Sequence, residues 1–245
     1  MFFLFDTMRP TMKSYPIITL CIAIFLVTSL SSCNNEADER KQEAVSILEQ
    51  RGIISELSYE KESMAAARGG DTELLKLLIA AGANINEEHL QWAAAYAHEE
   101  AVKILLEHGI SVNPPGRKGK LTPLHFAASG GNEKIVRLFL EKGADVNSRY
   151  INDGDTPLHG AARKGNPKCV ELLLNAGANI DSQNIHGDTP LHIAAMQGHH
   201  QCAKALLKAG ANPHIKNEDG KTPIQVAHGK CTEIPEMRGV EKEMN

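Results

Sequence analysis

A four-residue motif, Thr-Pro-Leu-His, recurs along the chain at nearly constant intervals. Its copies begin at Thr122, Thr156 and Thr189, and a weaker copy, Thr-Pro-Ile-Gln, begins at Thr222, so the intervals are 34, 33 and 33 residues. A fixed period of this length is typical of a protein built from stacked repeats. The fold is therefore expected to be a solenoid in which each repeat buries its apolar face against its neighbours.

Each copy of the motif predicts a helix, a turn, a second helix and a loop. Thr is a favourable N-cap residue, and Pro loses no hydrogen bond at the first helical position, so a first helix should begin at each motif. A second helix with apolar residues at helical spacing should follow, for example at residues 135–140. The glycines that should mark the turns between helices are Gly130, Gly165 and Gly198, and those that should end the second helices are Gly143, Gly177 and Gly210.

The motif and its period resemble the ankyrin repeat. Two earlier segments, residues 64–86 and 92–109, show the same succession of helices without the Thr-Pro pair. The resemblance implies an all-α repeat solenoid of about five full repeats, each a helix-turn-helix with a β-hairpin loop, with atypical terminal caps. Asn86 is followed almost at once by the next helix, so the hairpin between the first two repeats should be missing or reduced.

These features predict a capping helix, a repeat domain and a tail. The apolar pattern within residues 43–57 echoes the second helix of a repeat and should cover the open end of the stack. The ankyrin repeat domain is expected to span residues 58–230. Because Pro235 prevents a full second helix after the last motif, residues 231–245 are expected to form a C-terminal tail.

The beginning of the chain has the features of a secretion signal. An apolar run of 14 residues, from Ile17 to Leu30, follows two basic residues; it is short for a membrane span and typical of a signal-peptide core. It ends in Leu30-Ser31-Ser32-Cys33, which resembles the bacterial lipobox, in which the cysteine is acylated and becomes the mature N-terminus. The resemblance implies a lipoprotein signal peptide at residues 1–32 and lipidation at Cys33.

Residues 33–42 would then form a lipidated tether, because they are mostly polar and charged. Several acyl chains make membrane anchoring stable where one chain would be marginal. The expected location is the bacterial cell envelope, lipid-anchored to a membrane and facing the periplasm, and Asn34 favours the outer membrane. The alternative interpretation is an uncleaved anchor or a cysteine present by chance, and the candidate initiators are Met1, Met8 and Met12.

Charge and repeat geometry argue against several functional classes. The net charge is −4, so nucleic-acid binding is not expected. The residues His125, His159 and His192 occupy the same position in successive repeats, and packed helices lie about 8 to 10 Å apart, so their side chains cannot converge on one metal ion. In the ankyrin family this histidine is structural and links the Thr hydroxyl to the neighbouring hairpin backbone.

The remaining reactive side chains also lack a catalytic arrangement. Cys169 and Cys202 occupy equivalent helical positions too far apart for a disulfide, so they are expected to be free, packed thiols. The sequence contains no nucleophile elbow, phosphate-binding loop or metal-spaced cysteine set. We therefore expect no enzyme activity, no cofactor, no bound metal and no small-molecule substrate. The competing hypothesis is a metal-binding protein or enzyme that uses His199 and His200, with His186 and His214 nearby.

The ankyrin resemblance implies that a protein partner docks on the concave surface formed by the hairpin tips and the exposed side of the first helices. Tyr96, Arg163 and Met196 stand out there, because aromatic residues, Arg and Met are enriched at interface cores. Trp92 falls at an inward position and is expected in the core. The candidate partner-binding residues are Arg68, Tyr96, Arg117, Lys118, Ser129, Asp153, Asp155, Arg163, Lys164, Ile185, His186, Asp188, Met196, Gln197, Glu218, Asp219 and Lys221.

The function expected from these features is a membrane-tethered ankyrin-repeat module that mediates protein–protein interaction in the bacterial cell envelope. The partner is a protein that the sequence does not identify. A narrower alternative is an immunity or inhibitor lipoprotein that blocks a periplasmic toxin or enzyme, which a neighbouring toxin or hydrolase gene would support.

Overall fold

The computed structural model describes residues 36–53, 56–114 and 120–237. The expected signal peptide, the lipidation site Cys33 and the loop residues Arg117 and Lys118 lie outside the described residues. None of the helices in the described part of the chain combines the length and the apolar character that a membrane span requires.

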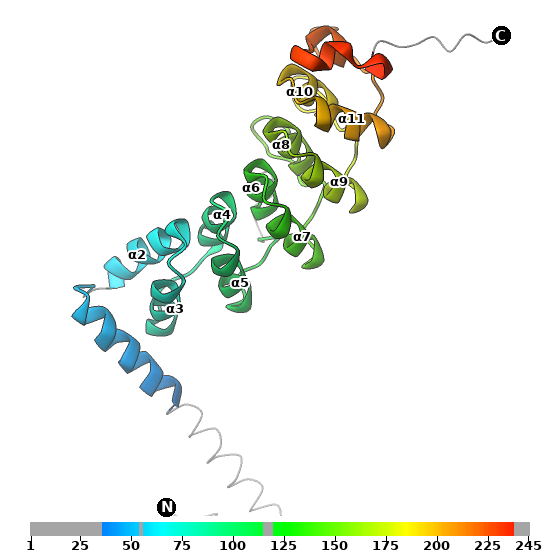
Figure 1. Ribbon diagram of the computed structural model, residues 1–245. Helices are drawn as coiled ribbons and strands as arrows, with labels where there is room; N and C mark the ends of the chain where they lie inside the picture. The colour runs from blue at the N-terminus through cyan, green and yellow to red at the C-terminus, as the bar shows by residue number, and fades with distance from the viewer. Residues whose placement is uncertain (1–35, 54–55, 115–119, 238–245) are drawn as a thin grey trace, which may run out of the picture.

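Five helix pairs stack side by side in a single row (Figure 1). The first helix of each pair contacts the first helix of the next pair, which gives an inner layer, and the second helices form an outer layer. The inner helices are α2 (Glu56–Gly69), α4 (Glu87–Ala95), α6 (Pro123–Gly130), α8 (Pro157–Lys164) and α10 (Pro190–Met196). The outer helices are α3 (Thr72–Ala81), α5 (Glu99–Glu107), α7 (Glu133–Glu141), α9 (Pro167–Asn175) and α11 (His200–Lys208).

Each Thr-Pro-Leu-His motif begins an inner helix, as the sequence predicts. In the second copy, Thr156 is the N-cap and Pro157 is the first helical residue. The Thr156 N–H donates to Nδ1 of His159 over 3.1 Å, and Nε2 of the same ring lies 3.1 Å from the carbonyl oxygen of Asp188 in the next repeat. Because Nδ1 accepts a hydrogen bond, Nε2 carries the proton and donates. The structural role implied by the ankyrin resemblance is therefore confirmed.

The turns between paired helices place glycine in the left-handed conformation. Gly165 and Gly198 take positive φ angles of 80° and 72° there, but in the earlier repeat the residue with positive φ is Gly131 (74°) and not the expected Gly130, which ends α6. Gly143, Gly177 and Gly210 also take positive φ angles at the ends of their outer helices, as predicted.

Three loops within the described residues, which we call fingers, project beyond the helices at residues 145–155, 179–188 and 212–221. Backbone hydrogen bonds close each of them, for example from Asn184 N–H to the Asp188 carbonyl over 3.0 Å. The described residues contain no assigned strand, so the expected hairpins are tight turns. No finger separates the first two repeats, because Asn86, just after α3, already caps α4, and the expected reduction of this loop is confirmed.

Both ends of the stack are covered. A helix at residues 36–50 packs Ala44 and Leu48 against Leu78 and Ala81 of α3. At the other end, the chain continues after α11 as three short 3₁₀ segments, which are η1 (Pro223–Val226), η2 (Gly229–Glu233) and η3 (Pro235–Met237). Cys231, Ile234 and Met237 are buried in the main core, so the cap extends to at least Met237, beyond the expected boundary at residue 230.

The thiols at the centre of the stack are unreactive. Cys169 and Cys202 are free and buried, as predicted, and Cys231 is free and buried in the C-terminal cap. Burial raises the pKa of Cys169 to about 12 and that of Cys202 to about 11. Because the thiolate is the reactive form, these residues serve as small packing groups at neutral pH.

Candidate protein-interaction surface

Most of the described candidate residues lie on the inner surface, meaning the exposed side of the inner helices and the fingers. Asp153 and Met196 are half-buried there. The exposed candidates on the inner helices and their C-terminal ends are Arg68, Tyr96, Ser129, Arg163, Lys164 and Gln197. The exposed candidates on the fingers are Ile185, His186, Glu218, Asp219 and Lys221.

Two candidate residues are not available to a partner. Asp155 and Asp188 are only 4% and 7% exposed, so their assignment as surface residues is wrong. Oδ1 of Asp155 accepts a hydrogen bond from Nδ2 of Asn184 in the next finger over 2.9 Å, and Asp188 accepts the same bond from Asn217. These carboxylates hold consecutive fingers together, because a buried carboxylate requires hydrogen-bond partners.

Arg163 contributes to the same network. Its Nη2 atom lies 2.5 Å from Oδ2 of Asp155, so the cation at this end of α8 is already neutralised within the chain. The side chain remains half exposed and can still present its remaining N–H groups. Arg163 is therefore a weaker anchor for a partner than its exposure alone indicates.

An aromatic cluster spans the first three repeats. Trp92 of α4 and Tyr96, the C-cap residue of the same helix, have ring centroids 6.0 Å apart, and the ring centroid of Phe126 of α6 lies 6.4 Å from that of Trp92. The guanidinium of Arg68 lies 5.2 Å from the Trp92 centroid and 5.4 Å from the Tyr96 centroid, within the range of a cation–π interaction. Nη2 of Arg68 also donates to the Tyr96 hydroxyl over 3.1 Å.

The position of Trp92 corrects the prediction that it belongs to the core. Its side chain is 37% exposed, and that of Tyr96 is 47% exposed. Adjacent exposed aromatic side chains form a contiguous apolar patch, and such patches mark interaction sites more often than single exposed apolar residues do. Together with Arg, they are the residue types that contribute most to binding energy at protein interfaces.

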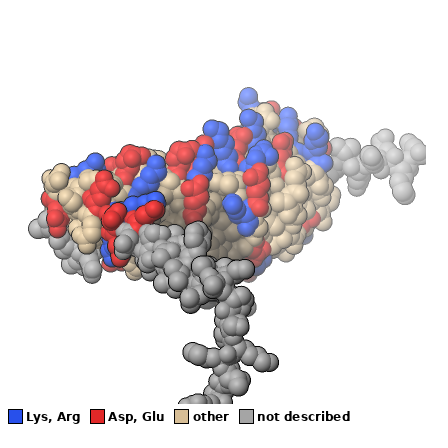
Figure 2. All heavy atoms as spheres, turned by 90° about the horizontal axis from the view of Figure 1, so that it is seen from below, with Lys and Arg blue, Asp and Glu red and all other residues tan. Residues whose placement is uncertain are grey.

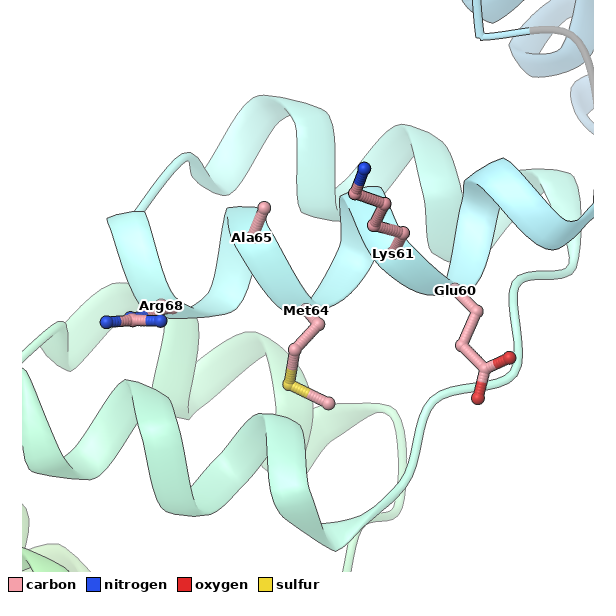
Figure 3. A pocket seen from close by; sticks show the side chains of 5 residues that line it. All are labelled: Glu60, Lys61, Met64, Ala65 and Arg68. Carbon is pink, nitrogen blue, oxygen red and sulfur yellow. The ribbon is translucent and has the colours of Figure 1, made fainter.

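A pocket next to this cluster runs along α2. It has a volume of about 580 Å³ and is lined by Glu60, Lys61, Met64, Ala65 and Arg68. Figure 3 shows Arg68 and Glu60 at opposite ends of the lining, with Met64 between them. The spacing of Glu60, Met64 and Arg68 by four residues places all three on one face of the helix.

A second pocket, of about 560 Å³, lies at the C-terminal end of the inner surface. It brings together Met196 of α10, His186 and Lys221 of two fingers, and His228 after η1. Several of the candidate partner-binding residues therefore line the same pocket. The lining of this pocket is more polar than that of the pocket on α2.

Two further exposed apolar residues lie at the finger tips. Ile151 and Ile185 belong to consecutive fingers, which are joined by a hydrogen bond from the Ile185 N–H to the Asp153 carbonyl over 2.8 Å. Ile185 was a sequence candidate, whereas Ile151 was missed. An isoleucine at a turn position between polar residues is a signal that could have identified both.

Charged side chains of both signs alternate over the face seen in Figure 2. Some of them form ion pairs between neighbouring repeats, such as Lys134 with Glu99 at 3.3 Å and Lys168 with Glu133 at 3.7 Å. Because these pairs are largely exposed, each contributes about 0 to 1 kcal/mol. They therefore add little to the stability of the stack.

His199, one of the histidines considered as metal ligands, has a structural contact between repeats. Nε2 of His199 lies 3.1 Å from the carbonyl oxygen of Arg163, which ties the turn after α10 to α8. His98 makes the same bond to the carbonyl of Arg68 over 2.9 Å. Within the described ranges, no group of three His, Cys, Asp or Glu side chains could hold a metal ion. The geometry therefore gives the metal-binding alternative no support.

Comparison with known proteins agrees with this architecture. The family model described as ankyrin repeats (3 copies) matches residues 63–150, 115–184 and 158–234. No curated protein matches the chain. The matched ranges cover most of the sequence and coincide with the stacked helix pairs and fingers, so the chain belongs to the ankyrin-repeat family, whose repeats form protein–protein interaction modules.

Proposed function

We propose that this chain is a membrane-tethered ankyrin-repeat module that binds a protein in the bacterial cell envelope through its inner surface. The observation that carries the binding role is the exposed cluster of Arg68, Trp92 and Tyr96. An exposed group of these three residue types matches the composition of interface hot spots.

The proposed tether rests on the sequence alone. The lipobox-like Leu30-Ser31-Ser32-Cys33 follows an apolar run of signal-peptide length. Lipidation of Cys33 would hold the repeat domain at a membrane surface through a short segment ahead of the helix at residues 36–50. Such placement would restrict the partner to proteins that reach the same membrane face.

The binding role is tested by affinity capture from envelope extract with matched variants. The wild-type protein should retain a protein that the double variant Trp92→Ala, Tyr96→Ala loses, because the variant removes two large apolar contacts. The control variant Glu171→Ala, Lys204→Ala changes exposed residues on α9 and α11 of the outer layer and should retain it. Equal capture by all three proteins would remove the inner surface from the proposal.

The tether is tested separately by membrane fractionation. The Cys33→Ser variant cannot be acylated at this position and should move from the membrane fraction to the soluble fraction. Metabolic labelling with a fatty-acid analogue should mark the wild type and leave the variant unmarked. A variant that stays in the membrane fraction would contradict lipid anchoring at Cys33.

A further inference from the structure

The first repeat uses its inner-surface arginine differently from a later repeat. Arg68 and Arg163 occupy equivalent positions in their repeats. In each repeat, the N-cap residue of the outer helix donates its N–H to the carbonyl of an alanine in the inner helix, which is Ala66 or Ala161, and the arginine follows this alanine by two residues. Arg163 is paired with Asp155 from the finger before its helix. Arg68 has no carboxylate partner among the described residues, and no finger lies between α3 and α4 to supply one.

The Arg68 guanidinium is nevertheless held in one place. The rings of Trp92 and Tyr96 flank it, and the Tyr96 hydroxyl takes one of its five N–H groups. Because the side chain is already oriented, a ligand that binds it loses less conformational entropy than one that must order a free arginine. The remaining N–H groups form a planar fork that fits a carboxylate.

The pocket beside Arg68 defines the second part of the ligand. Met64 and Ala65 form the apolar part of this open pocket, whose described lining lies entirely on α2 and whose volume is about 580 Å³. The lining carries two cations, Lys61 and Arg68, against one carboxylate, Glu60, although the whole chain has a net charge of −4. The pocket is thus locally positive on an acidic protein, which favours an acidic ligand.

We infer that the protein partner presents a carboxylate side chain to Arg68 next to an apolar side chain that enters the pocket of Met64 and Ala65. The inference rests on the proposed function and specifies the chemistry of the bound segment. The exposed faces of Trp92 and Tyr96 pack against the same segment and exclude water from the ion pair. The missing finger leaves this end of the inner surface open, so an extended or helical segment can reach it.

The test is a selection of peptides on the full-length protein in detergent. A random phage-displayed peptide library without tryptophan is selected for binding, and the enriched peptides are synthesised. Trp92 is the only tryptophan of the chain and lies beside Arg68, so its fluorescence reports occupation of this site directly. Enriched peptides are expected to carry Asp or Glu next to Leu, Ile, Phe or Met and to change Trp92 emission.

Variants separate this site from the rest of the surface. Arg68→Gln should weaken peptide binding by about tenfold or more, because a hydrogen bond to a charged group is lost. The control Lys204→Gln makes the same charge change at an exposed residue on α11 of the outer layer and should leave affinity unchanged. Arg68→Glu should regain affinity for a peptide whose acidic residue is replaced by Lys.

Three results would overturn the inference. The enriched peptides could lack acidic residues, bind the Arg68→Gln variant as tightly as the wild type, or leave Trp92 emission unchanged. Peptides that bind instead at the pocket around Met196 and Lys221, and are lost in Lys221→Ala, would end this inference but keep the proposed binding function. A selection that retains no peptide would count against both.

Discussion

The histidine of each Thr-Pro-Leu-His motif shows how much a single side chain does in this molecule. Nδ1 of His125, His159 and His192 accepts from the backbone of its own Thr, and Nε2 donates to a carbonyl of the following repeat or cap. The bond to Nδ1 requires the neutral ring, because protonation removes this acceptor, whereas Nε2 can donate in either state. Burial lowers the pKa of all three residues, which favours this neutral form.

Stability should therefore depend on pH. The pKa of these histidines is lower in the folded chain than in the unfolded chain, where it is about 6.5, so the unfolded state binds more protons as pH falls. The free energy of unfolding should therefore be highest at pH values above about 6.5 and should decrease as the pH falls below this pKa. Urea denaturation at pH 7.5 and at pH 5.5 measures the difference.

His159→Gln should reduce this pH dependence. Glutamine already occupies the equivalent position of the last motif, where Oε1 of Gln225 accepts from the Thr222 N–H over 2.9 Å. The variant should be less stable than the wild type at pH 7.5. Among the described contacts, Gln225 is seen to make only the bond to its own Thr, so a glutamine at position 159 is expected to lose the bond to the Asp188 carbonyl. An unchanged pH dependence would show that His159 is not one of the groups responsible.

A backbone position offers a second test on the scale of one residue. Ala97 has a φ of 64° and stands where other repeats have Gly70, Gly131, Gly165 or Gly198. Left-handed backbone costs a residue with a Cβ about 1 to 2 kcal/mol, and the greater flexibility of glycine offsets about half of this. Ala97→Gly should therefore raise the free energy of unfolding by about 0.5 to 1 kcal/mol.

The matched control for this change is Gly143→Ala. Gly143 also has a positive φ, of 77°, and a Cβ there would meet no atom within 4 Å, so only the backbone term changes. This variant should lose about as much stability as Ala97→Gly gains. Chemical denaturation measures both variants. If Ala97→Gly and Gly143→Ala changed the free energy of unfolding in the same direction, the positive φ would not be the cause.

At the scale of secondary-structure elements, the fingers depend on contacts between repeats. Nη1 of Arg149 donates to Oγ of Ser182 over 3.0 Å, and Nε2 of Gln183 donates to the Lys216 carbonyl over 3.1 Å. The Asn184 side chain adds the bond to Asp155 described above. Bonds between neighbouring fingers therefore help to order each finger, together with the bonds within it.

Asn184→Ala tests this dependence. The variant leaves Oδ1 of the buried Asp155 without its amide donor and also removes the acceptor of the His186 and Asp188 N–H groups, which together should lower the free energy of unfolding by about 1 to 3 kcal/mol. The control Asn152→Ala removes an exposed amide that bonds only to the Tyr150 hydroxyl among the described contacts, and it should have little effect. Equal effects of the two variants on the denaturation midpoint would contradict the role of Asp155.

The same contacts explain which parts of the structure the sequence predicts. The inner helices α6, α8 and α10 follow from local signals, since the N-cap Thr, the Pro and the His all lie within four residues. The burial of Asp155 does not, because its partner Asn184 lies 29 residues away and becomes a neighbour only in the correct stack. An aspartate beside a turn glycine is otherwise typical of solvent-exposed loops.

Trp92 was misplaced for a related reason. In each repeat, the N-cap residue of the outer helix donates its N–H to the carbonyl of an inner-helix alanine. The residue before this alanine is Trp92, Phe126, Gly160 or Ile193, and this position faces the inner surface. Ile193 is buried there, which matches the expected inward position, but the larger indole of Trp92 extends over Arg68 and stays partly exposed. The motif fixes the direction of the side chain, whereas its exposure depends on its size and on the neighbouring repeat.

At the scale of the whole molecule, stability should be distributed by nearest-neighbour contacts. Each helix pair contacts the pair before it and the pair after it, and the C-terminal cap contacts α10 and α11. Arrays of this kind open locally at an end before they unfold globally. Local opening at the C-terminal end of the row should therefore affect the C-terminal pocket without affecting the Arg68 cluster, and the reverse should hold for opening at the N-terminal end.

Ile234→Ala tests this independence. Ile234 is 2% exposed in the C-terminal cap, and removing a buried isoleucine side chain costs about 2 to 5 kcal/mol. Hydrogen exchange should become faster in α10 and α11 and stay unchanged in α4 and α5. Faster exchange along the whole row would indicate a single cooperative unit instead of a series of neighbours.

The central claim is that the inner surface near Arg68 is where a partner binds, and site-specific photo-crosslinking in intact cells tests it most directly. A photoreactive residue replaces Tyr96 in one variant and Arg137, exposed on α7 of the outer layer, in another. We predict that the Tyr96 position yields a discrete crosslinked protein and that the Arg137 position does not. A crosslink to a specific protein from Arg137 but none from Tyr96 would contradict the claim.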